Sequence, residues 1–67
     1  MTFYDKNGTP LQVGDHIVPD VGMELVIVSV AYVADYDAEC MFGQQVADPL
    51  AFSVLTKENL AHRWTKV

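Results

Sequence analysis

The side chains that most often carry out chemistry in proteins are few in this sequence and widely spaced. One thiol, Cys40, lies 24 residues after His16 and 22 residues before His62, whereas metal sites use closely spaced ligand pairs. Ser29 and Ser53 lie inside apolar runs, without the Gly-x-Ser-x-Gly turn that exposes a hydrolase nucleophile. The four glycines are isolated and form no phosphate-binding loop. We therefore expect no enzyme, no metal and no cofactor.

Three carboxylates alternate along a short polar segment, where Asp35, Asp37 and Glu39 could attract a hard cation. A calcium-binding loop also needs further oxygen ligands and a glycine at a fixed position, and the segment lacks both. The pattern is typical of a solvated hairpin tip. Acids at such a place also discourage sheets from pairing edge to edge.

Aromatic and basic side chains near the C-terminus are the best candidates for a binding surface. Arg63, Trp64 and Lys66 stand together, and Tyr4 and Tyr36 are further aromatic candidates from elsewhere in the chain. Aromatic and arginine side chains dominate the binding energy of protein interfaces. The alternative is that Trp64 belongs to the core, closing a barrel from a final strand on which it alternates with its neighbours.

Composition places these residues in one small ordered domain spanning residues 1–67. Hydrophobic residues make up 51% of the chain and charged residues 19%, which favours a compact fold over disorder. A lone cysteine makes no internal disulfide, and the first residues show no secretion signal. The longest apolar run is about half of the ~20 residues that a membrane helix needs. We expect a cytoplasmic protein without a membrane partner.

Charge is distributed unevenly. Residues 1–50 carry eight acids and one lysine, a net charge of −7, and residues 51–67 carry three basic residues and one acid, a net charge of +2. An acidic body repels phosphate backbones, so nucleic acid is a disfavoured partner. Two alternatives remain. One is a nucleic-acid-associated barrel that binds single strands through the C-terminal tail, and the other is an acidic mimic of nucleic acid. The tail cluster comprises Lys57, Arg63, Trp64 and Lys66.

The first half of the chain predicts a hairpin and two strands. Asn7-Gly8 is the dipeptide preferred in a type I′ turn, and residues 16–18 form a short strand that stops at Pro19. Residues 24–33 are rich in β-branched side chains and apolar at odd and even positions alike, so we expect a curved strand covered on both faces.

The second half predicts two more strands, a helical turn and a last strand. Residues 40–45 form a strand with Cys40 and Phe42 on one face, and residues 50–55 alternate large with small side chains. The large ones, Leu50, Phe52 and Val54, are expected to face the core. Thr56 is a good helix N-cap for residues 57–61, with Leu55 and Leu60 placed as a hydrophobic staple.

Short strands separated by turns about every ten residues indicate an all-β fold. We predict a small SH3-like barrel of five or six short strands with one helical turn near the C-terminus, in preference to an OB-like barrel. Asp5-Lys6-Asn7-Gly8 followed by Gly14-Asp15 resembles the barrel segment of YopX-type phage proteins, and Gly14-Asp15-x-Ile17 is similar to the opening of KOW modules. The resemblance implies a barrel and a bacterial prophage origin, and no functional residue.

The function that these observations favour is a non-enzymatic protein-interaction module with a protein partner yet to be identified. Because small barrels with unpaired edge strands often form dimers, the sequence also allows a homodimer.

Overall fold

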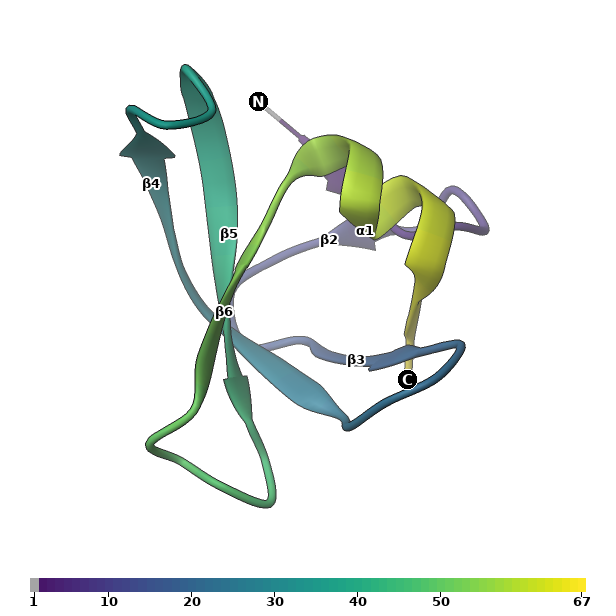
Figure 1. The fold of residues 1–67 in the computed structure, drawn as a ribbon. Helices are drawn as coiled ribbons and strands as arrows, with labels where there is room; N and C mark the ends of the chain where they lie inside the picture. Colours follow the sequence, from purple (N-terminus) through teal and green to yellow (C-terminus); the bar gives the residue numbers. More distant parts are fainter. Residues whose placement is uncertain (1) are drawn as a thin grey trace.

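The computed structural model describes residues 2–67, which form short strands and a single helix (Figure 1). In chain order the elements are β1 (Phe3–Tyr4), β2 (Pro10–Leu11), β3 (His16–Pro19), β4 (Leu25–Val33), β5 (Ala38–Gln45), β6 (Phe52–Leu55), α1 (Lys57–Arg63) and β7 (Trp64–Lys66). Five strands form one antiparallel sheet in the order β6-β5-β4-β3-β7, and β1 pairs with β2. The predicted all-β, barrel-like fold with a helix before its last strand is confirmed, although residues 2–67 form seven strands where five or six were predicted.

The core lies between the sheet, α1 and the β1–β2 hairpin. Leu60 is the buried residue of α1, and it meets residues that the strands contribute from one face. Thr56 caps the helix as predicted, because its hydroxyl oxygen accepts a hydrogen bond from the Asn59 N–H at 3.1 Å. The helix runs two residues beyond the predicted end. The core cluster consists of Phe3, Leu11, Ile17, Leu25, Ile27, Met41, Leu55 and Leu60.

β4 curves as predicted, and the expectation that both of its faces are covered is wrong. Its register with β5 shifts between Ile27 and Ser29, a bulge that bends and twists the strand. Before the bulge, Leu25 and Ile27 are buried, whereas beyond it Val30 and Tyr32 are exposed. The far half of the β4–β5 hairpin projects past α1 (Figure 1), so no second layer covers it.

β6 alternates as predicted, with the opposite face inward. Leu55 pairs with Met41, and both are core residues, which leaves Phe52 and Val54 on the other face of the sheet. Phe52 is 61% exposed and Val54 41%. Leu50, the third residue expected in the core, is exposed in the preceding turn. The capped helix directly after Leu55 determines this choice, because it brings Leu60 onto the same core.

The N-terminal hairpin forms, but its turn is not the two-residue type I′ turn that Asn7-Gly8 predicts. Tyr4 pairs with Pro10, so five residues separate the strands, and of Asn7 and Gly8 only Gly8 has a positive φ, of 81°. The Asp5 carboxylate accounts for the longer loop. Its Oδ1 accepts hydrogen bonds from the N–H groups of Asn7 and Thr9.

Candidate functional site

Trp64 lies at the margin of the core. It pairs with Pro19 across β3 and β7, is half-buried, and packs against the core cluster. Its indole Nε1 donates a hydrogen bond to Asn59 Oδ1 at 2.8 Å. The polar atom of Trp64 is therefore satisfied within the chain, and its ring supports the core from the β7 edge of the sheet.

The predicted basic candidates lie beside Trp64 without forming a continuous basic surface. Arg63 ends α1 and is exposed, and with Trp64 it lines a hollow of about 190 Å³ that also includes Asp20. Lys66 places its Nζ 3.6 Å from Asp15 Oδ1, so part of its charge is compensated. The tail therefore mixes basic residues with acids.

The predicted tyrosines lie on two other parts of the molecule. Tyr4 belongs to the β1–β2 hairpin and is 42% exposed, and Tyr36 lies in the turn between β4 and β5 and is 55% exposed. Tyr36 lines a different hollow from the one that Arg63 and Trp64 share. The structure thus brings Arg63 and Trp64 together and leaves Tyr36 apart from them.

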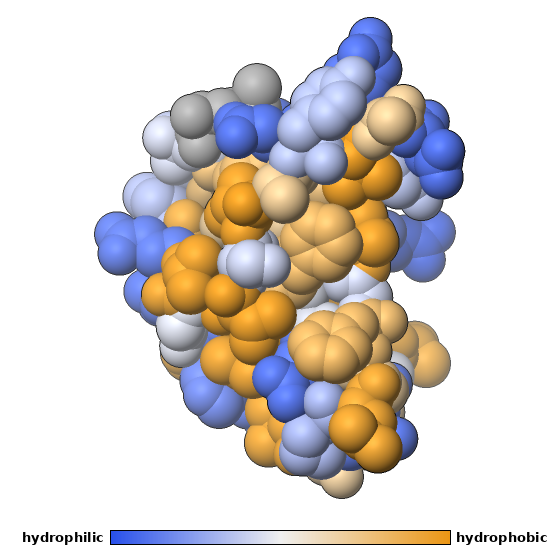
Figure 2. Space-filling view, turned by 90° about the vertical axis from the view of Figure 1, so that its left-hand side faces the viewer, coloured by the Kyte–Doolittle hydropathy of each residue, from blue (hydrophilic) through white to orange (hydrophobic). Residues whose placement is uncertain are grey.

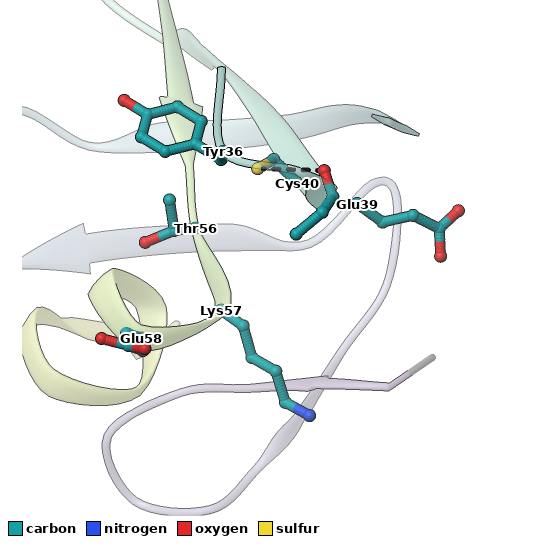
Figure 3. Close-up of a pocket in the computed structure, with 7 residues that line it drawn as sticks. Tyr36, Glu39, Cys40, Thr56, Lys57 and Glu58 are labelled. Atoms are coloured by element: carbon teal, nitrogen blue, oxygen red, sulfur yellow. Dashed lines mark hydrogen bonds between the residues drawn. The ribbon is translucent and has the colours of Figure 1, made fainter. Parts of the chain in front are cut away.

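The hollow beside Tyr36 has a volume of about 440 Å³ and lies where the β4–β5 hairpin meets the start of α1. Cys40 lines it from β5, is fully buried, and directs its thiol at the Ala38 carbonyl oxygen at 3.8 Å. In Figure 3 the Glu39 and Lys57 side chains extend away from the Tyr36 ring. Glu58 also lines the hollow, and among the described residues no hydrogen bond or ion pair joins the Cys40 thiol to Glu39, Lys57 or Glu58.

The acidic hairpin tip carries one defined interaction. The Tyr32 hydroxyl donates a hydrogen bond to Asp37 Oδ1 at 2.6 Å, and this hydrogen bond raises the pKa of Tyr32. Asp37 adopts a positive φ of 49° in the turn. Within residues 2–67, no three His, Cys, Asp or Glu side chains gather closely enough to hold a metal ion.

A more continuous surface lies on the side of β4, β5 and β6 opposite the core, and we call it the outer face. Residues paired directly across strands share a face, and two neighbouring rows follow from the register. One row holds Val26, Gln44 and Phe52, and the other holds Ser29, Phe42 and Val54. Figure 2 shows hydrophobic residues gathered over the side of the molecule that lies on the left in Figure 1.

The outer face is apolar at its centre and has no charged residue in its two rows. Phe42 and Val26 are half-buried, since they have neighbours within the sheet and no layer above them. The polar members are the Ser29 hydroxyl and the Gln44 amide, whose Nε2 donates to the Pro49 carbonyl oxygen at 2.8 Å. Sequence reasoning missed this surface because it assigned Phe52 and Val54 to the core.

The two edge strands of the sheet differ in whether other parts of the chain form hydrogen bonds with them. At the β7 edge, the Lys6 N–H donates to the Trp64 carbonyl oxygen at 2.9 Å, and the Lys66 N–H donates to Asp5. At the β6 edge, no backbone hydrogen bond from outside the β5–β6 pair reaches Phe52 or Val54 among the described residues. β6 is therefore the bare edge of the sheet.

Comparison with known proteins returned no match to any protein-family model, curated protein or solved structure. No helix formed by residues 2–67 has the length and the apolar character needed to cross a bilayer.

Proposed function

We propose that this chain is a non-enzymatic protein-interaction module that binds a protein partner through the outer face. The observation that supports the proposal is the pair of uncharged rows in which Phe42, Phe52 and Val54 lie side by side on β5 and β6. Interface centres are depleted of charge and enriched in aromatic residues, and this surface has that composition. A contiguous apolar patch on a small domain is often a binding site.

The chemistry of the partner follows from the same surface. An apolar sheet face with Gln44 and Ser29 as its polar members fits an apolar protein surface that carries a few hydrogen-bonding groups. The resemblance to YopX-type phage proteins supports a prophage origin, so a bacterial protein is the proposed class of partner.

The test compares capture of proteins from a bacterial lysate by the tagged chain and by two variants, each of which replaces an exposed valine by lysine. Val54→Lys places a charge in the middle of the outer face, and Val21→Lys places one at a residue that is 93% exposed in the β3–β4 turn. We expect a specific protein to be retained by the original chain and by Val21→Lys, and to be lost with Val54→Lys.

Nuclease treatment of the lysate separates this proposal from nucleic-acid association. A partner retained after treatment supports direct protein binding. Capture that disappears with nuclease, or that survives Val54→Lys unchanged in a folded variant, would overturn the assignment of the outer face.

A further inference from the structure

We propose that two copies of this chain pair through β6, strand against strand and antiparallel, about a twofold axis at Ser53. The inference goes beyond the proposed function, because it concerns the backbone edge of the sheet and a second copy, whereas the outer face concerns side chains and a different protein. It rests on the direction of the backbone groups of β6 and on the unprotected edge that they form.

The hydrogen bonds to β5 determine which backbone groups of β6 point outward. The Gln45 N–H donates to the Ala51 carbonyl oxygen at 2.9 Å, and hydrogen-bonded pairs alternate along an antiparallel ladder. Ala51, Ser53 and Leu55 therefore direct their backbone groups at β5. Phe52 and Val54 direct theirs away from the sheet, where nothing else in residues 2–67 bonds to them.

The outward backbone groups of β6 can form hydrogen bonds with the same groups of a second copy. In an antiparallel pair centred on Ser53, Phe52 of each copy stands opposite Val54 of the other, so outward N–H groups meet outward C=O groups. The same register places each Phe52 ring beside a Val54 side chain, an aromatic and β-branched cross-strand pair. The two outer faces then become one continuous surface across both sheets.

The β6 edge lacks three of the devices that keep sheet edges apart. Phe52–Leu55 contains no charged residue and no proline, and its register with β5 has no bulge. By contrast, the opposite edge at β7 is covered by the loop that contains Asp5 and Lys6. Pairing of two copies therefore has one available edge, and it closes after two copies instead of extending into a filament.

Edge-to-edge pairing leaves the side chains of the outer face on the surface, so backbone hydrogen bonds and two symmetric Phe52–Val54 contacts hold the two copies together. This contact is small beside the ~800 Å² per partner of a standard interface. We expect a weak, reversible dimer.

Sedimentation equilibrium of the full chain over a range of concentrations measures the pairing. We expect a monomer–dimer equilibrium that Val54→Pro weakens at least tenfold, because proline removes an outward N–H and no bond to β5. Val54→Thr keeps that N–H and the branched shape, so it should still dimerise. A chain that stays monomeric at every concentration, or a folded Val54→Pro variant that dimerises unchanged, would overturn the proposal.

Disulfide cross-linking tests the register without depending on the proline variant. Directly opposed residues of a non-hydrogen-bonded pair have Cα atoms about 4.5 Å apart, within the range that a disulfide spans. Ser53→Cys should therefore oxidise to a covalent dimer, whereas Phe52→Cys, opposed by Val54, should cross-link far more slowly. Equal rates for the two variants would contradict the register.

The two proposals fail separately. A monomeric chain that still captures a protein through the outer face would overturn the dimer and leave the proposed function standing. A dimer that captures no protein would overturn the proposed function and leave the dimer standing.

Discussion

The carboxylate of Asp5 joins the two ends of the chain, since its Oδ2 accepts a hydrogen bond from the Lys66 backbone N–H at 2.8 Å across 61 sequence positions. Its Oδ1 accepts from the N–H groups of Asn7 and Thr9 at 2.9 and 2.8 Å. Asp5 is 3% exposed, and it is the buried acid of the described residues. One side chain therefore shapes the first loop and holds the last strand against it.

Asp5→Asn should destabilise the fold. An asparagine amide presents two N–H donors on one side, so an N–H group would face either the Lys66 N–H or the N–H groups of the loop. Leaving buried donors without acceptors costs about 1–3 kcal/mol. Urea unfolding of Asp5→Asn against Asp35→Asn, which alters an exposed acid at the hairpin tip, measures the difference. Equal midpoints for the two variants would contradict the role of Asp5.

The same residue predicts how stability depends on pH. Burial raises the pKa of the Asp5 carboxyl, but the N–H groups of Lys66, Thr9 and Asn7 more than offset it, so its pKa lies below the usual range. A folded-state pKa below the unfolded one gives stability that is present above the unfolded pKa and is lost as pH falls through the folded pKa.

The advantage of the original chain over Asp5→Asn should therefore shrink below about pH 4, the unfolded pKa of an aspartate. Unfolding free energies of both proteins between neutral and acidic pH test this. A difference that stays constant to the lowest pH would show that Asp5 acts through packing alone.

Gly43→Ala should destabilise the sheet from inside the core. A Cβ at Gly43 would lie 2.8 Å from Leu25 Cδ1, 3.1 Å from Leu55 Cδ1 and 3.2 Å from Leu25 Cβ. Overpacking of this kind costs about 1–3 kcal/mol. Ser29→Ala, an exposed change on the outer face, should stay within about 0.5 kcal/mol. Thermal unfolding compares the two, and an unchanged melting temperature for Gly43→Ala would refute the close packing.

Several elements were predictable because local signals agree with the packing they serve. Thr56 caps the helix, and Leu55 and Leu60 both reach the core, as their spacing indicates. The β-branched run predicts β4 to within one residue. In these segments, a short stretch of sequence contains both the backbone preference and the buried side chain.

The outer face was not predictable from the sequence, because the alternation of large and small side chains along a strand does not show which of its two faces packs against the core. The phase of β6 depends on Leu55, on the helix that follows it, and on Gly43, whose missing side chain leaves room for Leu55. These are contacts between separate elements. The same holds for Asp5, which sequence reasoning passed over because its partner Lys66 lies at the other end of the chain.

Asp37→Asn should lower the pKa of Tyr32. The hydrogen bond from the Tyr32 hydroxyl to the Asp37 carboxylate holds the proton on the phenol, and burial adds to this effect. Replacing the carboxylate by an amide removes the negative charge that is the main cause of the raised pKa of Tyr32. Absorbance titration of tyrosinate in Asp37→Asn, with Asp35→Asn as the control, should show one tyrosine ionising at lower pH. Identical titration curves would place the Tyr32 hydroxyl outside this hydrogen bond in solution.

The Cys40 thiol should be protected in the native state and should report on opening of the hollow beside Tyr36. Cys40 has no exposed surface, although residues around it line a cavity of about 440 Å³. A thiol reagent must therefore wait for a local opening, and its rate follows the population of the opened state. Tyr36→Ala removes a ring that lines the same cavity and should speed labelling, whereas Tyr4→Ala, in the other hairpin, should not. Labelling of the original chain as fast as in urea would show that the native fold does not protect the Cys40 thiol.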